Sequence, residues 1–321
     1  MASPLESAAA APQTREWSPP YPVDVRLVLS VHSRGPRDPA YRVDASGAVW
    51  RTVLTPDGPG TLRMATRAGV RYINPGSPAI IRAAAWGPGA GWLLETLPAL
   101  LGEHDDLAGF VPVHPLLREM ASRHPGARVG RSGRVLEALV PAVLEQKVVG
   151  VEARRAWHYL LRRFGQPAPG PAPAGMRVFP DARTWARIPS WEWHRAGVEP
   201  GRAATITGAA RAAGRLEEIL TMAAGDADRR LRSLPGVGPW TSAEVRQRAC
   251  GDADAVSVGD YNLPAVVGWA LAGRVVDDAG MLELLAPYAG HRYRATRLVE
   301  LSGVAPPRRG PRLPLREYRR F

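Results

Sequence analysis

Two side-chain types are almost missing from this chain of 321 residues, which has one cysteine, Cys250, and one lysine, Lys147. A single cysteine excludes an internal disulfide, a four-cysteine iron–sulfur cluster and a zinc site built from cysteines. The seven histidines are scattered singly, which indicates structural or exposed positions and not a transition-metal site. We therefore expect no such metal centre.

Long hydrophobic runs are also missing. No apolar stretch approaches the roughly 20 residues that a membrane-spanning helix needs. The first twenty residues lack the basic start and the apolar middle of a secretory signal. We expect a cytoplasmic protein without membrane association, and a monomer is the default expectation for its oligomeric state.

Positive charge, by contrast, is in large excess. The formal net charge is +12 and the isoelectric point is about 10.8, as is typical of proteins that bind nucleic acid or another polyanion. Arginine supplies all but one of the 42 basic residues, alongside 33 glycines and 32 prolines. A GC-rich coding sequence produces this bias without selection for function, so the charge alone does not establish DNA binding.

The first third of the chain has the pattern of a small sheet. Short runs rich in Val, Leu and Thr, separated by turns, predict antiparallel strands at 23–34, 47–56, 60–68 and 70–76. An apolar run at 90–102 predicts a helix that covers one sheet face. We therefore predict an α+β domain at 20–105, preceded by a flexible tail at 1–19.

The chain becomes helical from residue 112 onward, because apolar residues recur there at three- and four-residue spacing. The predicted helices span 133–165, with a kink or break at Pro141, then 181–188, 200–215, 226–233, 239–249, 262–273, 278–287 and 290–302. This predicts an all-α domain at 106–305, followed by a basic tail at 306–321.

One stretch of the helical part, LPGVGPW, has the pattern of a helix–hairpin–helix. Proline ends one helix, the glycines permit positive φ or a close approach, and a second proline suits the first turn of the next helix. The unpaired N–H groups of that turn can bond a DNA phosphate. The predicted DNA-binding residues are Leu234, Pro235, Gly236, Val237 and Gly238. The alternative is a tight turn in which the glycines merely permit packing.

This string and the residues downstream of it resemble the helix–hairpin–helix DNA glycosylase superfamily, most nearly the DNA-3-methyladenine glycosylase II (AlkA-like) family. The family signature is a Leu-Pro-Gly-Val/Ile-Gly hairpin with an aspartate roughly twenty residues downstream, and here Asp260 lies 22 positions after Gly238. The likeness covers about 112–303 and includes 135–149, 177–188 and 197–213. It implies an enzyme that flips damaged bases, among them alkylated purines, out of duplex DNA, and thus a place at the nucleoid.

The resemblance implies that Asp260 is the catalytic residue. Cleavage of an N-glycosidic bond builds positive charge on the sugar, and a nearby carboxylate stabilises that charge while it orients or deprotonates the attacking water. The alternative is that Asp260 caps the next helix, which stabilises by roughly 0.5–2 kcal/mol. One carboxylate can do both.

Related enzymes that also cut the DNA backbone resemble one another in carrying a lysine just after the hairpin, where it forms a Schiff base with the sugar. Trp240 stands at that position here. The chain's lysine, Lys147, is interpreted as a solvated or phosphate-facing charge. A monofunctional, hydrolytic glycosylase is therefore expected.

A flipped base needs a pocket. Trp240 matches a pocket tryptophan of the family and can stack on a cationic base, or it can anchor the core. Tyr261 is expected to line the same pocket, with burial in the core as the alternative. Gln146 matches a polar residue near the pocket, although a glutamine there can also be simply solvated. Where the family places rings on its late helices, this chain has Glu244, which predicts a differently shaped or more polar pocket.

Further DNA contacts are implied outside the hairpin. The loop 127–132 aligns with the family's wedge loop, which makes Val129 the candidate intercalating residue. Arg292 and Arg294, with Arg297 nearby, are candidates for phosphate contacts, with ion pairs as the alternative.

The resemblance also implies a Na⁺ or K⁺ ion at the hairpin, held by the main-chain carbonyls of Arg232, Leu234 and Val237. No other cofactor is required. Two further hypotheses stay open: a DNA-binding protein that has the hairpin without catalysis, and a glycosylase for deaminated or oxidised bases.

Overall fold

The computed structural model describes residues 11–66 and 80–307. The N-terminal part forms a five-stranded antiparallel sheet in the order β1-β5-β4-β3-β2. The strands are β1 (Gln13–Trp17), β2 (Tyr41–Val43), β3 (Val49–Thr55), β4 (Gly58–Ala65) and β5 (Ile81–Trp86). Strands β3 and β4 overlap the predicted strands 47–56 and 60–68, whereas the predicted strand 70–76 falls outside the described residues.

The prediction of a flexible tail over 1–19 is wrong for its second half. Strand β1 pairs with β5, with Gln13 opposite Ala85 and Trp17 opposite Ile81. The edge of β5 presents backbone N–H and C=O groups that need partners, and β1 supplies them from across the sequence. Residues 1–10 lie outside the described part.

The predicted strand at 23–34 is also wrong. The chain there forms helix α1 (Val25–Leu29) and the short 3-10 helix η1 (Ser30–His32). The carboxylate of Asp24 accepts the backbone N–H of Leu27 at 2.9 Å and caps α1. The valine-rich composition suggested a strand, but the cap and the helical spacing of the buried side chains decide the local structure.

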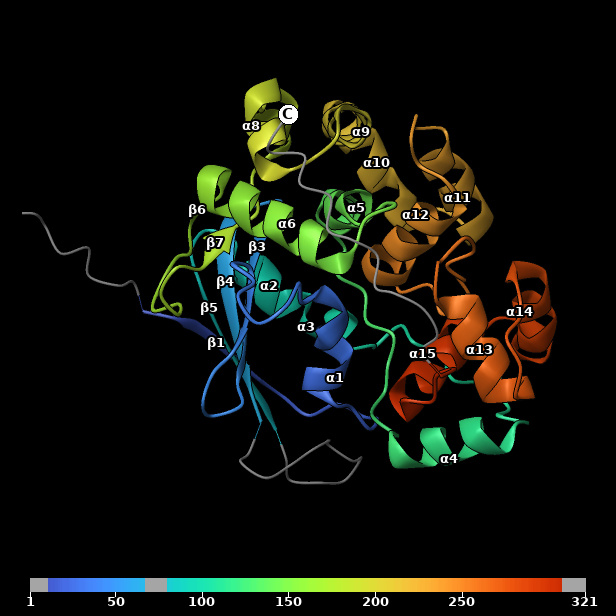
Figure 1. Cartoon of the computed structure of the whole chain (residues 1–321). Helices are drawn as coiled ribbons and strands as arrows, with labels where there is room; N and C mark the ends of the chain where they lie inside the picture. Colours follow the sequence, from blue (N-terminus) through green and yellow to red (C-terminus); the bar gives the residue numbers. More distant parts are fainter. Residues whose placement is uncertain (1–10, 67–79, 308–321) are drawn as a thin grey trace, which may run out of the picture.

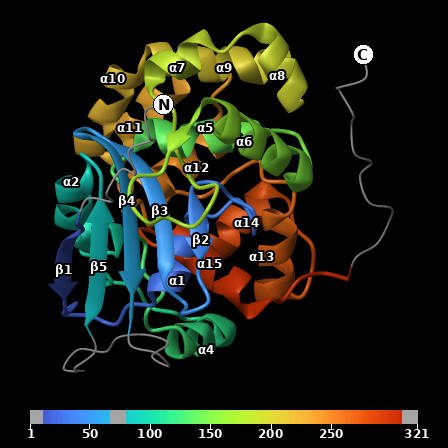
Figure 2. The same cartoon turned by 90° about the vertical axis from the view of Figure 1, so that its left-hand side faces the viewer.

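Both faces of the sheet are covered. Helices α1, α2 (Ala90–Glu95) and α3 (Leu97–Leu100) pack on one face, so the single helix predicted at 90–102 is two (Figure 1). On the other face the rings of Trp50 and Trp86 stack with their centroids 5.6 Å apart. The segment that carries the hairpin of β6 (Gln166–Pro167) and β7 (Arg177–Val178) crosses that face, as Figure 2 shows.

The rest of the described chain is helical, as predicted. Its α-helices are α4 (Pro115–Arg123), α5 (Val135–Leu144), α6 (Gly150–Phe164), α7 (Ala182–Arg187), α8 (Ser190–Ala196), α9 (Pro200–Arg211), α10 (Ala213–Glu217), α11 (Ala224–Arg232), α12 (Pro239–Val245), α13 (Leu263–Ala272), α14 (Asp278–Leu285) and α15 (Arg292–Ser302). Short 3-10 helices η2 (Glu218–Thr221) and η4 (Ala286–Tyr288) join some of them, and α12 continues into a π-helical turn, η3 (Arg246–Cys250). No helix in the described part of the chain is long and apolar enough to span a bilayer.

The break predicted at Pro141 occurs later. Helix α5 continues through Pro141 and ends at Leu144. The turn before α6 contains Lys147 at φ 54°, the one non-glycine residue with positive φ among the described residues. A left-handed residue ends a helix, whereas Pro141 removes one hydrogen bond from a helix that its packing holds together.

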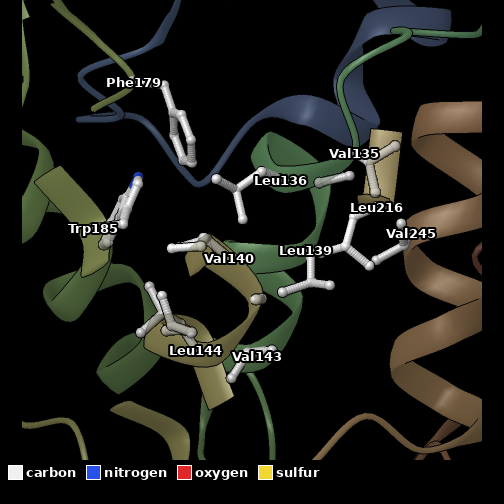
Figure 3. Close-up of a cluster of buried hydrophobic side chains, with 14 of the residues drawn as sticks. Val135, Leu136, Leu139, Val140, Val143, Leu144, Phe179, Trp185, Leu216 and Val245 are labelled. Carbon is white, nitrogen blue, oxygen red and sulfur yellow. The ribbon is translucent and has the colours of Figure 1, made fainter. Parts of the chain in front are cut away.

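Helix α5 is the centre of the main helical core. Its residues are buried on every side except at Glu137, and they pack against side chains from α7, α10 and α12, including Trp185, Leu216 and Val245 (Figure 3). A helix that is apolar all round must lie inside a bundle. A second core joins α4 to α13, α14 and α15. The candidate site lies where α12, from the first core, meets the loop that leads into the second.

Candidate functional site

The LPGVGPW stretch forms a tight turn between α11 and α12. The backbone N–H of Val237 donates to the carbonyl of Leu234 at 3.1 Å. Gly236 has φ +85°, and a Cβ atom there would lie 2.0 Å from Oγ1 of Thr205. Gly238 is extended, and a Cβ there would meet nothing within 4 Å. The two glycines therefore differ: Gly236 is required by the fold, and Gly238 leaves the backbone open to an approaching ligand.

The predicted hairpin contacts differ in exposure. Pro235 and Gly236 are exposed, whereas Val237 is buried at 6% exposure and anchors the turn in the helical core. Leu234 is half-buried against the same core. The surface that can meet a phosphate is thus the backbone of the turn and the start of α12, and not the side chains of Leu234 and Val237.

Gln146 braces this hairpin. Its amide nitrogen donates to the carbonyl of Gly236 at 2.9 Å and to Oγ1 of Thr241 at 2.8 Å. These bonds tie the turn after α5 to the start of α12. Lys147, the next residue, is exposed. Gln146 therefore contacts the backbone of the hairpin and a threonine of α12. Its predicted role in a base pocket stays a prediction.

Asp260 lies near the end of the loop 251–262 that connects η3 to α13. Its Oδ1 atom accepts the backbone N–H groups of Asn262 at 2.8 Å and Leu263 at 2.9 Å, which caps the start of α13. Its Oδ2 atom accepts the indole N–H of Trp240 at 3.0 Å. The side chain is half-buried, so the carboxylate stands at the surface with a defined orientation. The two roles weighed for Asp260 are compatible, since one oxygen caps the helix and the other faces the hairpin helix.

The two predicted pocket aromatics have different environments. Trp240, in the first turn of α12, is half-buried and bonded to Asp260. Tyr261 is 82% exposed, which contradicts the alternative of burial in the core. An aromatic ring this exposed beside Asp260 is available to a large ligand, although it lines no enclosed cavity.

The prediction that Val129 is the intercalating residue is wrong. The side chain is 8% exposed, and its backbone N–H donates to Oδ2 of Asp105 at 3.0 Å. An intercalating residue must project from the surface, whereas this one is buried and lines a small pocket with residues of α1 and α15. The sequence carries no local signal for this burial, because Asp105 is distant in the chain.

The two candidate phosphate-binding arginines of α15 are in ion pairs, the alternative left open by the sequence. Arg294 is buried and binds Asp105 through Nη1 at 3.0 Å and Nη2 at 2.5 Å. Arg292 forms a two-pronged pair with Asp254. The prediction that Arg294 contacts DNA is therefore wrong, because its charge is already paired with Asp105 inside the protein.

The predicted cation site consists of backbone carbonyls at the end of α11 and in the hairpin. The Leu234 carbonyl accepts the N–H of Val237 and so retains one lone pair for an ion. Hard carbonyl oxygens are the donors that alkali ions take, so this set fits the implied ion in donor type. Within 11–66 and 80–307, no three His, Cys, Asp or Glu side chains are grouped to hold a metal.

Sequence reasoning missed the residues that support the site. Thr205 on α9 backs Gly236, and Ser257 and Gln247 hold the loop that carries Asp260. Each is a common polar residue whose role depends on a partner that folding brings near. No spacing in the sequence distinguishes them.

This chain is similar to DNA glycosylases of known structure. No protein-family model matches it. It superposes on a 3-methyladenine DNA glycosylase from Archaeoglobus fulgidus with a TM-score of 0.70 at 16% identity, over 90% of this chain and 98% of the other. An 8-oxoguanine glycosylase/lyase from Clostridium acetobutylicum gives 0.65 at 10% identity, over 90% and 98%. The fold is therefore that of the DNA glycosylases.

A sequence relative agrees with the fold. Over 153 residues the chain is 33% identical to a protein of Mycobacterium tuberculosis described as a probable bifunctional transcriptional activator/DNA repair enzyme AlkA. That stretch is 46% of this chain and 30% of the relative, so the chain spans about a third of its curated relative's length. Together the comparisons confirm the resemblance to the AlkA-like DNA glycosylases that the motifs indicate.

Proposed function

We propose that this protein is a DNA glycosylase that flips a damaged base out of duplex DNA and hydrolyses its N-glycosidic bond. The observation that carries the proposal is the Asp260 carboxylate, held at the surface by Trp240 at the start of the hairpin helix. A phosphate bound by the hairpin backbone brings the deoxyribose of the same strand toward that carboxylate. The comparisons with glycosylases support the same reaction class.

Asp260 stabilises the positive charge that develops on the sugar and orients or deprotonates the water that attacks it. An alkylated purine already carries positive charge and leaves as a neutral base, so the site requires no strong general acid. Trp240 offers a π face to a cationic base. Its bond to Asp260 brings the stacking ring and the carboxylate together, which favours alkylated purines as substrates.

The proposed reaction is monofunctional. A lyase step needs an amine that forms a Schiff base with the sugar, and Trp240 occupies the position after the hairpin where related lyases carry it. Lys147, the one lysine of the chain, lies in the turn between α5 and α6. Trapping with borohydride should therefore give no covalent DNA adduct, and the abasic product should remain uncut until alkali is added.

The substitution Asp260→Asn tests the catalytic assignment. Asparagine caps a helix about as well as aspartate, so the variant preserves the start of α13 while it removes the charge and the oxygen that accepts from Trp240. We expect release of 3-methyladenine and 7-methylguanine to slow by about 10²–10⁴-fold, with DNA affinity retained. Release is measured in single turnovers on methylated duplex DNA.

The matched control is Asp277→Asn, which changes the side chain that caps α14 at Gly280. It alters a helix-capping carboxylate of the same type and should leave release unchanged. Equal release by the wild type and Asp260→Asn would overturn the catalytic role of Asp260. No release above background by the wild type would overturn the enzyme assignment and favour the DNA-binding hypothesis. Release of hypoxanthine, uracil or 8-oxoguanine, with methylated purines untouched, would overturn the substrate class.

We further propose that a Na⁺ or K⁺ ion binds the carbonyls of Arg232, Leu234 and Val237, where it would add positive charge beside a bound phosphate. No other cofactor is needed for hydrolysis. The partner is duplex DNA, the protein acts as a monomer, and its location is the cytoplasm at the nucleoid.

A further inference from the structure

Three polar side chains hold the loop that carries Asp260. Glu244 lies on α12, Gln247 on its continuation η3, and Ser257 on the loop itself. Glu244 accepts the hydroxyl of Ser257 at 2.6 Å. Gln247 donates to the same hydroxyl at 2.9 Å and to the carbonyl of Ala255 at 2.8 Å. Gln247 and Ser257 are both buried. Buried and satisfied, these bonds fix the loop relative to α12 more strongly than surface contacts would.

Ser257 is one turn before Asp260. The backbone N–H of Asp260 donates to the carbonyl of Ser257 at 3.2 Å, so the anchored residue and the carboxylate share a tight turn. The carboxylate itself is bonded to Trp240, one helical turn before Glu244. The same helix therefore holds the loop at two points, one at the buried Ser257 and one at Asp260.

Glu244 is also bonded on the side away from Ser257. The second oxygen of Glu244 binds Nη1 of Arg248 at 2.7 Å, and Nε of Arg248 donates to the carbonyl of Val31 at 3.0 Å. Val31 belongs to η1, beside the sheet. A chain of bonds thus runs from the sheet part, through Arg248 and Glu244, to the loop that carries Asp260.

The helix changes form where these residues lie. Gln247 and Arg248 are in η3, a π-helical turn that continues α12. Such turns are rare and occur often at functional sites. Here the turn carries two of the side chains that reach the loop and the sheet part.

We propose that Glu244, Gln247 and Ser257 are positioning residues that set the location of the Asp260 carboxylate relative to the deoxyribose. This inference rests on the proposed glycosylase function. The three residues touch no substrate; they act through the loop. A carboxylate displaced by about 1 Å can cost about 100-fold in rate. Loss of the bonds to Ser257 therefore slows cleavage of the glycosidic bond while the hairpin still binds DNA.

The test compares two buried serines. Ser257→Ala removes the bond to Glu244 and the bond from Gln247. Ser242→Ala removes a similar bond, since Oγ of Ser242 donates to Asp228 of α11 at 2.7 Å. Both variants lose one buried serine–carboxylate bond, and Ser257→Ala also frees the amide of Gln247. We expect Ser257→Ala alone to slow single-turnover release at saturating enzyme by about 10- to 100-fold, with its dissociation constant for undamaged duplex unchanged.

Glu244→Gln provides a second variant, because an amide cannot accept both from Ser257 and from Arg248. The double variant of Glu244→Gln and Ser257→Ala should be no slower than the slower single variant, as residues of one unit are non-additive. Additive losses, or equal rates for Ser257→Ala and Ser242→Ala, would overturn the positioning role.

Asp260→Asn in the same assay separates this inference from the proposed function. If Asp260→Asn is inactive while Ser257→Ala and Glu244→Gln release bases at the wild-type rate, the positioning role is wrong and the glycosylase assignment stands. If Asp260→Asn is fully active, the catalytic role of Asp260 fails first, and the positioning role fails with it.

Discussion

At the scale of single residues, Asp260 shows how one side chain serves the fold and the site together. One oxygen caps α13 and the other accepts from Trp240. An oxygen that accepts one hydrogen bond keeps a second lone pair, so the contact with Trp240 does not exhaust the carboxylate. The cap fixes the backbone and leaves charge available to a ligand.

His32 gives a residue-scale prediction about pH. Desolvation, together with the charges of Arg51, Arg248 and Arg34, lowers the pKa of His32 well below its usual value. The folded protein therefore keeps this ring neutral at a pH where the unfolded chain binds a proton. Stability should be complete above about pH 6.5 and should fall as the pH decreases below it.

The measurement is urea unfolding at pH 7.5 and pH 5.5. The substitution His32→Gln should reduce the stability lost between these two values, because no ring remains to be protonated in the unfolded chain. His104→Gln, at an exposed position, is the control and should retain the wild-type loss. An unchanged loss in His32→Gln would contradict the prediction.

At the scale of elements, the two glycines of the hairpin have different structural roles, although they look alike in the sequence. Gly236→Ala introduces a methyl group against Thr205 at a positive φ, and we expect a cost of about 1–3 kcal/mol in unfolding free energy. Gly238→Ala meets open space with an extended backbone. It should keep its stability and weaken binding to duplex DNA, because its methyl group stands where a phosphate approaches.

Thermal unfolding and fluorescence-anisotropy titrations measure the two effects. The prediction is a crossed pattern: Gly236→Ala is the less stable variant, and Gly238→Ala is stable but binds weakly. If both variants keep their stability and affinity, the backbone of the hairpin is not the DNA-binding surface.

At the scale of the whole molecule, one buried ion pair joins distant parts of the chain. Arg294 on α15 binds Asp105, which lies just after the sheet part, and both side chains are less than 5% exposed. Asp105→Asn leaves the guanidinium charge without its partner, and we expect a loss of about 3–5 kcal/mol. Asp254→Asn breaks the pair of Arg292 on the same helix, which is about one-third exposed, and should cost about 1 kcal/mol or less.

Chemical denaturation of both variants checks this difference. A similar small loss for the two would show that the Asp105–Arg294 pair does not stabilise the junction. Local unfolding can be followed by hydrogen exchange at α15, which we expect to lose protection in Asp105→Asn only.

Much of the fold could be predicted because its signals are local. The helical period of the second part, the turn at LPGVGPW and the strands β3 and β4 follow from spacing and from residues such as Gly236. The helix at Val25–Leu29 was missed because composition favoured a strand, while one cap at Asp24 and burial against the sheet decided the outcome.

The sequence by itself determined the candidate residues for the proposed chemistry: it placed Trp240 after the hairpin and Asp260 one loop later, with no lysine at the position where related lyases carry one. Only the tertiary structure decided which candidates lie at the surface and which are buried. Val129 and Arg294 are buried, and the buried Ser257 bonds Glu244 and Gln247 and so holds the loop. The physical reason is that burial and charge pairing depend on partners far along the chain, and no local pattern encodes them.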